Sequence, residues 1–167
     1  MRLLFTIWLA LIGIGLVVLW DYSNKPGLAA LAPEFWPSNT SLKHDPKAAN
    51  LLMFVLPNCP CSKSSLGELN QIIAKTNGKI NVKIISVTPE DQEADRFGAR
   101  TSGQVLLYDK QGKLVFSGGI TSARGHFGDS FGKSAIISFI NHNHLEHKST
   151  PVFGCALKDY HDNPRTN

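Results

Sequence analysis

The sequence predicts an α/β domain of three layers behind one N-terminal membrane helix. Three observations lead to this prediction. A long apolar segment without charge, residues 3–20, lies at the N-terminus. A short apolar run, residues 51–56, is followed at once by two cysteines and a helical pattern. Strand and helix patterns then alternate and end in a hairpin and a last helix, an order typical of a mixed sheet flanked by helices.

The segment 3–20 has the length and composition of a membrane span. Its residues at 1.5 Å rise make about 27 Å, close to the about 30 Å of a hydrocarbon core. Arg2 precedes the segment and Asp21 follows it. By the positive-inside rule, the N-terminus is expected in the cytoplasm and the rest of the chain on the other side of the membrane.

A cleaved signal peptide is the alternative for this segment. The small-residue pattern Ala30-Leu31-Ala32 resembles a cleavage site, but the apolar run exceeds the about 7–15 residues usual for a signal core. This length favours a retained anchor. In either case the cysteines face a compartment in which disulfides persist.

Composition and the positions of proline and glycine divide the chain into four parts. We expect an anchor at residues 1–20, a proline-containing linker at 21–49, a folded domain at 50–145 and a tail at 146–167 that carries Cys155 and has a disordered polar end. Hydrophobic residues make up 43% and charged residues 18%, which is typical of a globular protein. The net charge of +4 comes from scattered basic residues, so nucleic acid is not an expected partner.

Each element of the domain follows from its own local pattern. The run 51–56 is too short for a helix and suits a strand buried on both faces. β-branched alternation predicts the later strands, and Gly or Pro marks the ends of the helices. In chain order, the further elements are a helix ending near Asn77-Gly78, a strand at 80–88, a short helix at 89–97, a hairpin of strands 104–109 and 113–117, a glycine-rich loop at 118–132, and a helix at 133–143.

Cys59 and Cys61 flank Pro60 where the buried strand leads into the first helix of the domain. The first turn of a helix presents unpaired N–H groups and the positive end of the helix dipole, and both favour a thiolate over a thiol. Free cysteines also occur as small apolar fillers. A proline-bracketed pair that opens a helix favours the reactive interpretation.

Five short motifs support a family resemblance. They are Cys59-Pro60-Cys61-Ser62, Thr101-Ser102-Gly103, Gly118-Gly119-Ile120-Thr121, Arg124-Gly125-His126 and Phe153-Gly154-Cys155. With them, residues 51–143 resemble the thioredoxin superfamily and, more narrowly, the small membrane-anchored bacterial proteins of the RedB type. The resemblance implies a thioredoxin-like fold, no cofactor, a place in the bacterial inner membrane with a periplasmic domain, and protein or small-molecule thiols and disulfides as partners.

The sequence departs from the thioredoxin pattern at two points. Thioredoxin-like proteins usually carry Cys-x-x-Cys, whereas here the family alignment puts Cys59 at the nucleophile and Ser62 at the second cysteine, with Cys61 as an extra thiol. The proline that forms a cis peptide before the third strand of the family is absent, and Gly103 stands near its place.

The first functional hypothesis is a thiol–disulfide oxidoreductase in which Cys59 attacks and either Cys61 or Cys155 resolves. Ser62 and Arg124 are auxiliary candidates. A bridge between Cys59 and Cys61 would close a small strained ring, and this strain favours a disulfide donor or isomerase. Cys155 either bridges to the motif or packs in a small docking segment of the tail.

The second hypothesis is metal capture. Cys59, Cys61, Cys155 and His126 together offer a sulfur and nitrogen donor set suited to Cu(I) or Zn(II), which would make the chain a copper-binding or copper-delivery protein. A third hypothesis is a structural scaffold for a membrane partner. No phosphate-binding loop or Ser-His-Asp order is present, so kinase and hydrolase functions are not expected.

Overall fold

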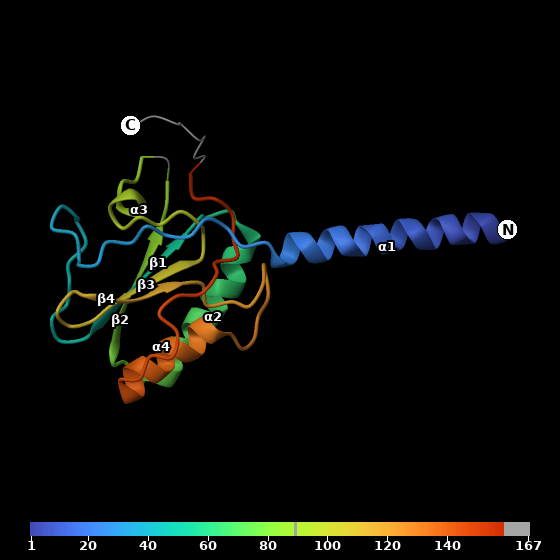
Figure 1. The fold of residues 1–167 in the computed structure, drawn as a ribbon. Helices are drawn as coiled ribbons and strands as arrows, with labels where there is room; N and C mark the ends of the chain where they lie inside the picture. The colour runs from blue at the N-terminus through green and yellow to red at the C-terminus, as the bar shows by residue number, and fades with distance from the viewer. Residues whose placement is uncertain (89, 159–167) are drawn as a thin grey trace.

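The structure is a computed structural model of the chain that describes residues 1–88 and 90–158. Its centre is a mixed sheet of strand order β2-β1-β3-β4 (Figure 1). β1 and β2 run parallel, and the other neighbouring strands run antiparallel. The α/β fold predicted from the sequence is confirmed. The strands are β1 Ala49–Val55, β2 Ile80–Ser86, β3 Gln104–Tyr108 and β4 Leu114–Gly118.

β1 is central and buried along its whole length, as the apolar run predicts. Because successive side chains of a strand point to opposite faces, Leu51 and Met53 pack on one side of the sheet and Leu52 and Phe54 on the other. The first face is covered by α2 and α4, seen side by side to the lower right of the sheet in Figure 1. These helices are α2 Pro60–Thr76 and α4 Phe131–His142.

The opposite face is covered by one short helix, α3 Glu93–Arg96, and by the segment that follows the N-terminal helix. Trp36 of this segment packs edge-on against Phe97 and Tyr108, with ring centroids 5.2 and 5.3 Å apart. The helix expected at 89–97 is shorter in the structure, where it spans Glu93–Arg96. Its first predicted position, Pro89, lies outside the described residues. Docked apolar side chains replace the missing helical surface.

The N-terminal helix, α1 Arg2–Asn24, projects from the domain, and nearly all of its side chains are exposed (Figure 1). It is long and apolar enough to cross a membrane. It extends four residues past the predicted end of the span. The chain contacts the domain soon after α1 ends, where the Gly27 N–H donates to the Val152 carbonyl at 2.8 Å.

A buried ion pair holds the glycine-rich loop that leads into α4. Lys133 Nζ lies 2.7 Å from the Glu68 carboxylate, and both side chains are almost fully buried. Lys133 Nζ also donates to the Gly128 carbonyl at 2.9 Å, while the Gly128 N–H donates to Glu68 Oε1 at 2.6 Å. Ser130 caps the helix by accepting from the Lys133 N–H, so α4 begins two residues earlier than predicted. These contacts fix the loop to α2.

The tail lies along the edge of the domain up to Lys158. Ser149 forms a parallel bridge with Ser117 of β4, and residues 155–157 return to the middle of the molecule. The predicted disordered end, residues 159–167, lies outside the described residues. The tail is thus part of the folded domain through the position of Cys155.

Candidate thiol site

The junction of β1 and α2 places Cys59 at the start of a helix. Cys59 is the N-cap residue, and Pro60 occupies the first helical position. Proline loses no hydrogen bond there, because the N–H groups of the first turn have no partner within the helix. The Cys59 side chain is buried at this point. The predicted placement of the sulfur beside electropositive backbone is therefore present in the structure.

The tail pairs with the loop before β3 as a short antiparallel strand. Residues 155–157 exchange backbone hydrogen bonds of 2.8 and 2.9 Å with residues 100–102. Gly154 makes this approach possible, because a Cβ there would lie 1.9 Å from the Ser102 carbonyl oxygen. Backbone pairing and a glycine contact therefore fix the position of the next residue, Cys155.

This pairing brings all three sulfurs of the chain together. The Sγ atoms of Cys59 and Cys155 lie 2.8 Å apart, and the three cysteine Sγ atoms lie within 4.8 Å of one another. All three cysteines are free thiols. The docking-segment and bridging interpretations of Cys155 are thus compatible, because the docked tail holds its thiol against the motif.

Hydrogen bonds make Cys59 the most acidic thiol of the cluster. Burial raises the pKa of Cys59, but hydrogen bonds from the Cys155 side chain and backbone, and from the Cys61 backbone and Ser62, outweigh this effect. Together they lower the pKa of Cys59 from 9.0 to about 7. The bond to Cys59 and burial raise the pKa of Cys155 to about 11. At neutral pH, Cys59 is the group that ionises and Cys155 is the group that donates to it.

Ser62 and Ser102 connect the helix start to the loop before β3. Their hydroxyls lie 3.0 Å apart, and both are buried. Ser102 Oγ also accepts from the Leu56 N–H at 2.9 Å, at the end of β1. Ser62 therefore has a buried polar partner and contributes to the environment of the Cys59 sulfur. The structure describes no cis peptide bond, and Gly103 has a positive φ of 89°.

Arg124 reaches the cluster from the glycine-rich loop. Its Nη1 donates to the Gly154 carbonyl at 2.6 Å, next to Cys155. Burial and the negative charge of Cys59 raise the pKa of Cys61, while the Arg124 guanidinium acts in the opposite direction. The candidate role of Arg124 near the thiols is consistent with this position. The guanidinium also lies over the Tyr22 ring, 4.9 Å from its centroid.

His126 does not belong to the sulfur cluster. Its side chain is exposed on the glycine-rich loop, and in the described part of the chain the only group of three or more possible metal ligands consists of the three cysteines. The donor set that the structure assembles is therefore three sulfurs.

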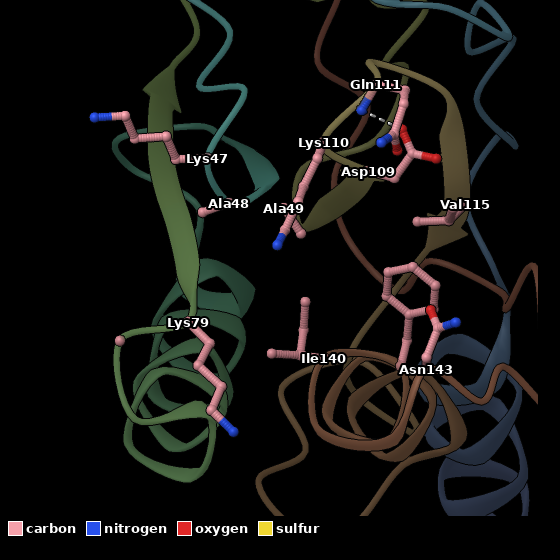
Figure 2. Close-up of a pocket in the computed structure, with 12 residues that line it drawn as sticks. Lys47, Ala48, Ala49, Lys79, Asp109, Lys110, Gln111, Val115, Ile140 and Asn143 are labelled. Atoms are coloured by element: carbon pink, nitrogen blue, oxygen red, sulfur yellow. Dashed lines mark hydrogen bonds between the residues drawn. The ribbon is translucent and has the colours of Figure 1, made fainter.

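A cavity of about 600 Å³ lies elsewhere in the domain, beneath the β3–β4 turn (Figure 2). Three lysines are among the residues that line it, and Val115 and Ile140 face the cavity. None of the residues that line it is a candidate site residue. By contrast, a smaller cavity of about 380 Å³ opens directly beside Cys59, between Pro57 and Lys63.

Known structures share this fold at low sequence identity. A hypothetical protein from Sinorhizobium meliloti aligns with a TM-score of 0.55 and 18% identity, covering 81% of this chain and 95% of that one. An uncharacterized conserved protein from Geobacillus kaustophilus aligns with a TM-score of 0.54 and 18% identity, covering 81% and 94%. Trxlp from Edwardsiella tarda aligns more weakly, with a TM-score of 0.42 and 19% identity, covering 56% of this chain and 82% of that one.

No protein-family model matches the sequence, and no curated protein matches it. The fold and the site together define the class: an α/β protein with a mixed four-stranded sheet flanked by helices, a cysteine pair at the β1–α2 junction and a third cysteine beside it. The sequence did not indicate the tail strand, the contact between Ser62 and Ser102 or the contact between Arg124 and Tyr22. The glycine before Cys155 was the one local sign of a close approach.

Proposed function

We propose that this chain is a membrane-anchored, extracytoplasmic thiol–disulfide oxidoreductase with Cys59 as nucleophile and Cys155 as resolving thiol. The observation that carries the proposal is the 2.8 Å contact between their sulfurs. The lowered pKa of Cys59, about 7, supplies a thiolate at neutral pH. The cavity beside Cys59 gives a substrate disulfide access to the sulfur.

The reaction then proceeds in two exchanges. The Cys59 thiolate attacks one sulfur of a substrate disulfide, forming a mixed disulfide and expelling the other substrate sulfur as a thiolate. Cys155 transfers its proton to a departing thiolate and attacks the Cys59 sulfur. This step forms the Cys59–Cys155 disulfide and releases the second substrate sulfur as a thiolate, which takes from water the proton that Cys59 gave up on ionising. The substrate gains two electrons and two protons, and the protein dithiol loses them; the reverse sequence donates a disulfide.

Cys61 takes a secondary place in this proposal. Its pKa is raised, so it remains a thiol at neutral pH. The Cys59–Cys61 bridge considered from the sequence would close a strained ring across one residue, whereas Cys155 meets Cys59 from a separate segment. Cys155 is therefore favoured as the resolving thiol, with Cys61 as the auxiliary one.

The proposal is tested by the reduction of insulin disulfides with dithiothreitol as electron source. The Cys59→Ser variant is expected to fall to the uncatalysed rate, because a serine hydroxyl does not ionise at neutral pH. The Cys61→Ser variant is the matched control, two residues away, and is expected to retain most of the activity. If the Cys59→Ser variant were as active as the unaltered protein, the proposed mechanism would be contradicted.

The location of the site is proposed from the anchor. α1 is exposed and apolar along its length, with the N-terminal amine and Arg2 before the apolar run and Asp21 and Lys25, whose charges cancel, after it. This arrangement supports a single span with the N-terminus in the cytoplasm and the thiol domain in the periplasm of a bacterium. There, disulfides persist and serve as substrates.

Copper binding is the second candidate function, because the three sulfurs lie within 4.8 Å of one another. Three thiolates form a soft donor set that suits Cu(I), and His126 is a further donor only if its loop rearranges. Anaerobic titration of the reduced protein with Cu(I), against a competing chelator, tests this. A copper carrier is expected to lose tight binding in Cys61→Ser. Equal affinity in that variant would exclude a three-sulfur site.

A further inference from the structure

A groove separates the last turns of α1 from the glycine-rich loop, and we call it the anchor groove. Its volume is about 660 Å³. In Figure 1 the loop between β4 and α4 reaches toward the base of α1. The groove is lined by Leu16, Leu19, Trp20, Ser23 and Asn24 of α1 and by residues 122–126 of the loop.

The two walls of the anchor groove differ in chemistry. The α1 wall presents the exposed side chains of Leu16, Leu19 and Trp20. The loop wall consists of residues 122–126 and includes the cationic residue Arg124. An apolar wall continuous with the membrane helix and a cationic wall beside it fit an amphiphile with a negative head.

The loop wall is held in place by the end of α1 itself. The Arg124 N–H donates to the Ser23 carbonyl at 2.9 Å, and its Nη2 donates to the Lys25 carbonyl at 3.3 Å. These bonds, with the ring of Tyr22 below the guanidinium, tie the loop to the helix. The two carbonyl bonds use two of the five guanidinium N–H groups, the Cys61 sulfur is a further acceptor and Nε is buried. An N–H group of the two terminal nitrogens is left for an anion.

The aromatic residues of α1 indicate where the anchor groove lies relative to the bilayer. Trp20 and Tyr22 are the aromatic residues at the end of the apolar run, and such residues lie at the headgroup level of a bilayer. Arg124 contacts Tyr22 and therefore lies at the same level. Phe127, three residues further along the loop, is 57% exposed and adds an apolar side chain to the same loop.

We propose that the anchor groove binds an anionic phospholipid, with its phosphate at Arg124 and its acyl chain along Leu16 and Leu19. The inference rests on the proposed membrane anchor and not on the thiol chemistry. It has a consequence for that chemistry, because Arg124 also donates to Gly154, the neighbour of Cys155. A bound lipid would hold the thiol cluster at the membrane surface, where its partners are polypeptides with cysteines near the headgroups.

The test uses the full chain in nanodiscs of phosphatidylcholine alone or mixed with phosphatidylglycerol, followed by amide hydrogen exchange. Phosphatidylglycerol is expected to slow exchange across residues 122–127 severalfold. Exchange in the β3–β4 turn, residues 110–112, is the internal control and is expected to be unchanged. Because the attraction is electrostatic, added salt is expected to weaken the effect. Equal exchange of residues 122–127 in both lipids would overturn the proposal.

Two arginine variants test the assignment of the phosphate. Arg124→Gln is expected to lose the difference between the two lipids, and Arg124→Lys is expected to keep part of it because it retains the charge. An undiminished difference in Arg124→Gln would overturn the role of Arg124. Cys59→Ser is expected to keep the lipid effect in full while losing exchange activity, so failure of the lipid site and failure of the oxidoreductase proposal are distinguishable.

Discussion

Replacing Cys155 with alanine is expected to raise the pH at which Cys59 becomes reactive from about 7 toward 9.0 and to abolish the intramolecular disulfide. The Cys155 thiol donates a hydrogen bond to the Cys59 sulfur, and alanine cannot. The thiolate form is the deprotonated one, so loss of this donor shifts its formation to higher pH. Reactivity at neutral pH should therefore fall while reactivity at high pH remains.

The size of the effect follows from the thiolate fraction. At pH 7, a thiol of pKa about 7 is about half ionised, whereas one of pKa 9.0 is about 1% ionised. A less acidic thiolate is intrinsically more nucleophilic, by about tenfold over two pKa units, so the net loss in rate is about fivefold. The measurement is the pH dependence of iodoacetamide labelling, with Cys59 and Cys61 resolved by peptide mass spectrometry.

Serine at position 155 separates the two roles of the thiol. Its hydroxyl donates a hydrogen bond but cannot form a disulfide, so Cys155→Ser is expected to keep more of the low pKa than Cys155→Ala. Both variants should accumulate the mixed disulfide between Cys59 and a substrate, visible on non-reducing gels. If neither variant trapped it, Cys61 would be the resolving thiol.

Replacing Lys133 with methionine is expected to lower the free energy of unfolding by about 3–5 kcal/mol. The two side chains of the Lys133–Glu68 pair are buried, with Lys133 at 2% and Glu68 at 0% exposure. Methionine preserves much of the volume but leaves the Glu68 carboxylate without its buried cation. The carboxylate then loses a charged partner 2.7 Å away in a place that water does not reach. Urea denaturation measures the difference.

Two further variants give this prediction its controls. Combining Lys133→Met with Glu68→Leu removes both charges and is expected to restore much of the lost stability. Lys79→Met, at an exposed position after α2, is expected to change the stability by no more than about 0.5 kcal/mol. A loss in Lys133→Met no larger than that in Lys79→Met would show that the ion pair contributes little.

The sheet and the cysteine junction followed from local sequence patterns. Each of these features can be predicted from a few neighbouring residues: the apolar run of β1, the turn between β3 and β4, and the glycine after α2. Asn77 and Gly78 both have a positive φ, as a helix stop requires. Such signals are local because they depend on side-chain periodicity and on backbone freedom, which can be read along the chain.

The assembly of the site did not follow from local patterns. The tail binds residues 100–102 through backbone hydrogen bonds, which any side chains can accompany. Arg124 reaches Gly154 and Tyr22 from a loop without periodicity. His126 lies in the same short motif as Arg124 yet points to solvent, because neighbouring loop residues face different directions. Contacts of this kind depend on the tertiary arrangement alone.

Trp36 and its neighbours cover the second face of the sheet. This cover affects which fragments of the chain are expected to fold on their own. The indole lies against Phe97 and Tyr108, which are both fully buried. A fragment starting at β1 would contain every strand and every cysteine but would leave this aromatic surface in water. We therefore expect a stable fragment to need the segment that carries Trp36 as well as the sheet.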